Sequence, residues 1–158
     1  MPAGRGLGWR EGGLVRAGRA RDDHDRDHRH GVAFWYLPEQ AVDGVPWFGI
    51  ASDEGAIGGI PLDVFGPTLT LSLAVEAPAG GQFSVWGTVD DAEHPPFKFS
   101  TATGLTQTTV ITASHSHLSW AFTVPGEYLV EARTSGTVVA TGAQMTSAPV
   151  VYRFVVEP

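Results

Sequence analysis

Residues Ser114–Tyr128 read SHSHLSWAFTVPGEY and carry the strongest structural signal in the sequence. Within it Leu118, Trp120 and Phe122 fall two residues apart. Successive side chains of a β-strand point to opposite faces, so these three point to one face, which we expect to be buried. The stretch therefore predicts a half-buried strand.

The opposite face of this strand carries His115, His117 and Ser119, which we expect to be exposed. The two imidazoles are then held side by side, roughly 6–7 Å apart at their Cα atoms. Neutral imidazole nitrogens are good zinc or copper ligands, and a site needs three or four ligands. His94, or a carboxylate within residues 90–93, would complete the shell. The alternative is that both histidines are exposed or hydrogen-bonded to neighbouring serines for structural reasons.

A tight turn follows the predicted strand at Val124–Glu127. Pro125 pre-sets φ at the second position of the turn, and Gly126 accepts a positive φ at the third. Short alternating segments recur along the chain, and no segment of 12 residues shows helical periodicity. Strands are expected at residues 32–37, 69–75, 83–87, 97–99, 108–112, 117–123, 127–134, 137–141 and 150–156, with a loop or short strand at 45–50 and a loop at 51–66. About eight short strands at this spacing predict an all-β fold, an antiparallel, immunoglobulin-like β-sandwich.

The first 30 residues differ in composition from the rest. Residues 1–30 are rich in Gly, Arg, Asp and His with few apolar positions, so we expect a disordered tail followed by a sandwich domain at 31–158. His24, His28 and His30 could bind metal, although a solvated charge run is the favoured explanation. The chain lacks Cys, which excludes disulfides and thiolate sites.

The charge of the predicted domain narrows its partners. Residues 31–158 contain three basic residues against twelve carboxylates, a net charge of −9. An acidic domain disfavours nucleic acid and anionic membrane as partners and is compatible with cations. No run of about 18 apolar residues predicts a membrane span, and neither a secretory signal nor a wall anchor is recognisable.

The decisive stretch resembles the actinobacterial surface-anchored protein domain of the "choice-of-anchor M" type, whose members carry His-x-His-x-Asn-Trp-Ala-Phe-Thr-x-Pro-Gly-x-Tyr. Ser119 stands in place of the Asn. The matching residues are His115, His117, Trp120, Ala121, Phe122, Thr123, Pro125, Gly126 and Tyr128. Further similarity lies at residues 36–40 with Trp47, at 81–86 and at 149–154. The resemblance thus covers roughly 31–158.

The resemblance implies an exported, extracellular or cell-wall domain without enzymatic activity. It also implies a role in zinc- or manganese-type metal acquisition, in which the partner is a metal-binding lipoprotein or an ABC transporter component. The residues themselves agree that catalysis is not expected, because neither a Gly-x-Ser-x-Gly elbow nor a phosphate loop occurs.

Two other functions stay open at this point. Trp47 and Phe48 lie between Pro46 and Gly49 and could form an exposed aromatic platform for cell-wall glycan, which would make the domain an adhesion module. Packing of both rings against the domain is the alternative, since aromatic side chains bury most of their area in most folds. The domain could also be a structural spacer.

Overall fold

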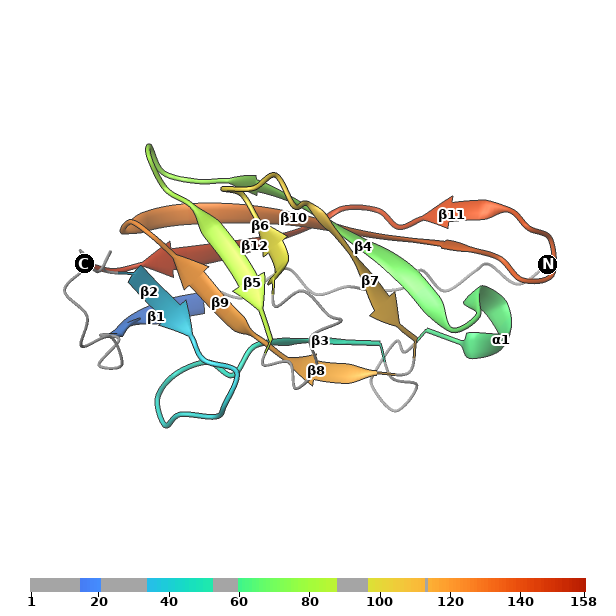
Figure 1. Ribbon diagram of the computed structural model, residues 1–158, viewed down its shortest axis with the longest axis horizontal. Helices are drawn as coiled ribbons and strands as arrows, with labels where there is room; N and C mark the ends of the chain where they lie inside the picture. The colour runs from blue at the N-terminus through green and yellow to red at the C-terminus, as the bar shows by residue number, and fades with distance from the viewer. Residues whose placement is uncertain (1–14, 21–33, 53–59, 88–96, 113) are drawn as a thin grey trace, which may run out of the picture.

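The computed structural model describes residues 15–20, 34–52, 60–87, 97–112 and 114–158 (Figure 1). They form twelve strands and one short helix. In chain order these are β1 (Val15–Ala20), β2 (Phe34–Leu37), β3 (Gly49–Ala51), α1 (Leu62–Phe65), β4 (Thr68–Glu76), β5 (Phe83–Trp86), β6 (Phe97–Ser100), β7 (Gln107–Ile111), β8 (His115–His117), β9 (Ser119–Phe122), β10 (Gly126–Thr137), β11 (Gln144–Thr146) and β12 (Val150–Val156).

Ten of the described strands lie in two layers, and β3 and β8 form a separate two-stranded ribbon. One layer has the order β1-β12-β10-β4-β7, with β11 also paired to β10, and the other has the order β6-β5-β9-β2-β1. In Figure 1, β5, β6 and β9 cross over β10, β12 and β4. Among the described strands every pair is antiparallel except β1 with β12. The predicted all-β, immunoglobulin-like sandwich is confirmed.

Strand β1 joins the two layers. Val15–Ala17 pair in parallel with β12, and Gly18–Ala20 pair antiparallel with β2. The prediction placed all of residues 1–30 in a tail and missed this strand, because its sequence VRAGRA contains a single strong β-former. The other residues of the predicted tail lie outside the described part of the chain.

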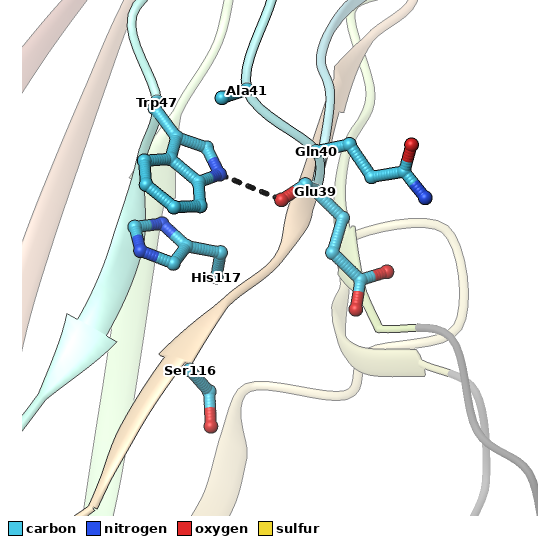
Figure 2. A pocket seen from close by; sticks show the side chains of 6 residues that line it. All are labelled: Glu39, Gln40, Ala41, Trp47, Ser116 and His117. Carbon is cyan, nitrogen blue, oxygen red and sulfur yellow. Dashed lines mark hydrogen bonds between the residues drawn. The ribbon is translucent and has the colours of Figure 1, made fainter.

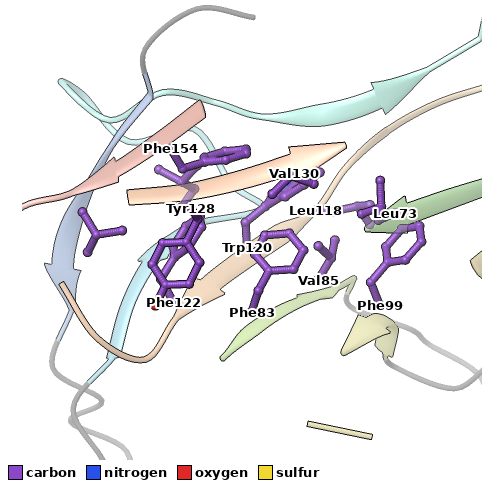
Figure 3. Close-up of a cluster of buried hydrophobic side chains, with 12 residues drawn as sticks. Leu73, Phe83, Val85, Phe99, Leu118, Trp120, Phe122, Tyr128, Val130 and Phe154 are labelled. Carbon is purple, nitrogen blue, oxygen red and sulfur yellow. The ribbon is translucent and has the colours of Figure 1, made fainter. Parts of the chain in front are cut away.

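The core lies between the layers and is strongly aromatic (Figure 3). The ring of Phe154 lies near its centre, with centroids 5.3 Å from Phe122 and 5.9 Å from Trp120. The buried cluster consists of Leu37, Leu73, Phe83, Val85, Phe99, Leu118, Trp120, Phe122, Tyr128, Val130, Phe154 and Val156. The predicted burial of Leu118, Trp120 and Phe122 is therefore confirmed.

The predicted turn at Val124–Glu127 is held by Tyr128. The Tyr128 hydroxyl donates to the carbonyl oxygen of Val124 at 3.0 Å and accepts from its N–H at 3.2 Å. Gly126 has φ +135°, and a Cβ there would lie 2.6 Å from Pro78 Cγ, so both backbone and space favour glycine. A tyrosine whose hydroxyl returns to the backbone at this corner is a hallmark of immunoglobulin-like sandwiches.

The predicted strand at 117–123 is in fact two strands in different sheets. The strand is interrupted at Leu118. Before it β8 pairs with β3, and after it β9 lies between β5 and β2. Ser119, which we expected to be exposed, is buried, and its Oγ accepts a hydrogen bond from the Glu39 N–H at 3.2 Å. That expectation was wrong because β9 is an interior strand with the 38–48 loop over it.

Two other expectations also need correction. Residues 137–141 do not form a separate strand: β10 continues to Thr137, the chain turns with Gly142 N–H donating to Val138 O at 2.8 Å, and β11 follows. Gly142 has the positive φ that such a turn requires. Helix α1 interrupts the loop predicted at 51–66, and its Val64 carbonyl accepts from Val139 N–H at the hairpin tip.

Candidate functional site

The candidate site lies where the β3–β8 ribbon meets the 38–48 loop. Gly49 lies opposite His117 in the ribbon, and a Cβ at Gly49 would come within 2.4 Å of Ser116 O. Close approach of the two strands therefore requires glycine at this position. The position of His117 thus depends on a residue 68 positions earlier in the chain.

The loop returns Trp47 to the ribbon by a short turn. Val45 N–H donates to Val42 O at 3.1 Å, and Gly44 has φ +76° within this turn. The indole Nε1–H of Trp47 then donates to the Glu39 carbonyl oxygen at 2.7 Å. This hydrogen bond links the end of the loop at Trp47 to its beginning at Glu39.

Three rings form a stack on this side of the molecule. The Trp47 ring lies on the His117 ring at a centroid distance of 3.5 Å and an interplanar angle of 8°. The His115 ring lies 4.8 Å from the His117 ring, tilted by 38°. Residues two apart in a strand share a face, which is the arrangement we predicted for the two histidines. The stacking of Trp47 on His117 was not predicted.

The nitrogen atoms of the histidines bear on metal binding. His117 Nδ1 is buried and has no hydrogen-bond partner, whereas His115 is exposed. Within the described ranges, no group of three or more His, Cys, Asp or Glu side chains could hold a metal ion. His94, predicted as a third ligand, lies in residues 88–96, outside the described residues, as do His24, His28 and His30.

An open pocket of about 540 Å³ lies beside the ring stack (Figure 2). Figure 2 shows the Trp47 and His117 rings one above the other. The Glu39 and Gln40 side chains come from the facing segment of the 38–48 loop. The described residues that line the pocket are Glu39, Gln40, Ala41, Trp47, Ser116 and His117. One of the two candidate metal ligands, His117, and the candidate aromatic residue Trp47 therefore line the same pocket.

Phe48 does not belong to an exposed platform. Its ring packs edge-on against Trp120 at 4.9 Å, Phe154 at 5.5 Å and Tyr152 at 6.0 Å. The expectation that Trp47 and Phe48 are both exposed is corrected, because neighbours in an extended segment point to opposite sides and Phe48 points to the core. Trp47 is 53% exposed.

Sequence reasoning missed Glu39 and Gln40 as pocket residues. They follow β2 after Pro38, and only the turn at 42–45 brings Trp47 back over them. The single signal in the sequence is a polar pair eight and seven residues before an isolated tryptophan, which is too common to be specific. Their contribution to the pocket is visible only in three dimensions.

Comparison with known proteins gives little further guidance. No family model matches the chain, and no curated protein matches it. Among solved structures, one similar chain is the N-terminal domain of PorA, with a TM-score of 0.45 and 10% sequence identity over 94% of this chain and 90% of that chain. The resemblance stated above to the choice-of-anchor M type therefore stays an expectation.

None of the helices in the described residues has the length and apolar character needed to cross a membrane.

Proposed function

We propose that this chain is a non-enzymatic, exported surface domain that binds a transition-metal ion through His115 and His117. The observation that carries the proposal is the pair of adjacent imidazoles, with ring centroids 4.8 Å apart on one face of β8. The buried Nδ1 of His117 without a hydrogen-bond partner adds to it, because buried polar atoms are normally paired.

The chemistry of the donor set fits a zinc- or copper-type ion in part. Imidazole is a ligand for both, and coordination uses a ring nitrogen in the ring plane, so Trp47 stacked on the face of His117 does not obstruct it. Two histidines leave one or two coordination positions to be filled. The net negative charge of residues 31–158 favours the approach of a cation over that of an anion.

The rest of the proposal depends on the resemblance in the sequence. On that basis the domain lies outside the cell or on the cell wall. It passes metal to, or receives it from, a metal-binding lipoprotein or an ABC transporter component. We propose no catalytic step. The Ser114 hydroxyl, beside His115 in the sequence, donates to the carbonyl oxygen of Ile111, which supports a proposal without a serine–histidine nucleophile.

The test is calorimetric titration of the full chain with zinc and with copper. The chain used carries His24→Ala, His28→Ala and His30→Ala, so that the N-terminal histidines do not contribute. We expect micromolar or tighter binding, weakened at least about tenfold by His115→Ala. His115 is exposed, so this variant is expected to fold. Equal binding with and without His115→Ala, or no binding, would refute the proposal.

A further inference from the structure

Trp47 is held rigidly although half of its surface is exposed. One face of the indole lies on His117 at 3.5 Å, and its only polar hydrogen is donated to the Glu39 carbonyl oxygen at 2.7 Å. The side chain is 53% exposed. With one face and one edge occupied, the ring cannot rotate away without losing both contacts. The structure thus presents a fixed, flat, apolar surface to solvent.

The pocket next to this surface is of a size suited to a small ligand. Its volume of about 540 Å³ falls within the range of roughly 300–1,000 Å³ typical of small-molecule sites. Glu39, Gln40 and Ser116 are among the residues that line it. A carboxylate, an amide and a hydroxyl can together offer hydrogen-bond acceptors and donors to a ligand.

The mixture of groups selects a class of ligand. An anionic ligand is disfavoured, because the described lining residues include no Lys or Arg and do include Glu39. A wholly apolar ligand would match the indole but not the polar residues of the lining, Glu39, Gln40 and Ser116. A quaternary ammonium ion calls for a cage of several aromatic faces, and among the described lining residues Trp47 alone offers an indole. A sugar ring has an apolar C–H face and a rim of hydroxyls, so it matches both features.

We propose that this pocket binds a neutral pyranose residue, with its C–H face stacked on Trp47 and its hydroxyls hydrogen-bonded to Glu39 and Gln40. This function is additional to metal binding, and each of the two functions depends on one side chain that the other does not use. Metal binding depends on His115, which does not line the pocket, and sugar stacking depends on Trp47. The shared residue, His117, supports the indole from behind.

The test is saturation-transfer NMR with the full chain and soluble neutral oligosaccharides: hexamers of glucose in both β-1,4 and α-1,4 linkage, of mannose, of xylose and of N-acetylglucosamine. We expect at least one to bind in the micromolar to low-millimolar range. Calorimetry with that probe should show a loss of at least about tenfold for Trp47→Ala and a smaller loss for Gln40→Ala. Monosaccharides of the same sugar distinguish a free sugar from a polymer as the natural source.

Two controls make the outcome decisive. Val42→Ala removes another exposed side chain of the same loop that does not line the pocket, and it should bind the sugar normally. His115→Ala should also bind normally, which separates this proposal from metal binding. No binding by any oligosaccharide would overturn the proposal. Unchanged binding by both Trp47→Ala and Gln40→Ala, with folding verified by circular dichroism, would also overturn it.

Discussion

Replacing Tyr128 with Phe tests whether one hydroxyl holds the corner of the sandwich. The Tyr128 ring is fully buried, and its hydroxyl makes two hydrogen bonds, both to the backbone of Val124. Phe keeps the shape of the ring and removes only the oxygen. The variant therefore leaves the packing of Phe122 on this ring, at 5.0 Å, in place and breaks both bonds.

The expected loss follows from those two bonds. A net contribution of about 0.5–1.5 kcal/mol for each bond gives a decrease of about 2 kcal/mol in the free energy of unfolding. Val124 is only half-buried, so water can satisfy part of what the hydroxyl did and the loss should not be much larger. With a urea m-value of about 2 kcal/mol per M, the unfolding midpoint should fall by about 1 M.

Urea unfolding followed by circular dichroism measures this loss. Tyr152→Phe is the matched control, because it removes the same oxygen atom from a tyrosine that is only half-buried, on the neighbouring strand β12. The control should change the free energy of unfolding by less than about 0.5 kcal/mol. If the two variants lose the same amount, or if Tyr128→Phe loses nothing, the corner does not depend on the hydroxyl and the reasoning is wrong.

Two further predictions concern the ribbon and the pH dependence of stability. Gly49→Ala places a Cβ against Ser116 O, so it should separate β3 from β8 and lower the free energy of unfolding by about 1–3 kcal/mol. The near-ultraviolet circular dichroism of the Trp47–His117 stack should decrease with it. An unchanged spectrum and an unchanged unfolding midpoint would contradict this expectation. Desolvation by burial raises the pKa of Tyr152 above its ordinary value of 10.0, so the folded state holds this proton more tightly than the unfolded state does. Its contribution to stability is then complete below about pH 10 and is lost as the pH rises above that value, so stability should fall less steeply above pH 10 in Tyr152→Phe than in the wild type.

The period-two pattern predicted the core but not what lies over it. Leu118, Trp120 and Phe122 are buried as expected, because apolar side chains two residues apart lie on one face of a strand and that face packs against the core. Ser119 is buried as well, under a loop whose Glu39 is 80 residues away in the chain. A local pattern contains no information about such a distant covering segment.

The sequence allowed the types of residue in the site to be predicted, but not how these residues come together in space. His115 and His117 share a face because of strand geometry, which the sequence determines. Trp47 and Phe48 could each have turned inward, and only the turn at Gly44 and the packing of Phe48 against Trp120 decide between them. Strand β1 was missed for a related reason: its sequence is weak, and its place depends on β2 and β12.

The parallel pairing of β1 with β12 has a mechanical consequence. In a parallel pair, the start of one strand and the end of the other lie at opposite ends, so a pull on the chain ahead of Val15 and behind Val156 slides the strands along each other. The hydrogen bonds of the three residue pairs are then loaded together, in shear, instead of opening one after another. Under such tension the domain would resist extension at this strand pair first, and the load would reach the aromatic core only after β1 has detached.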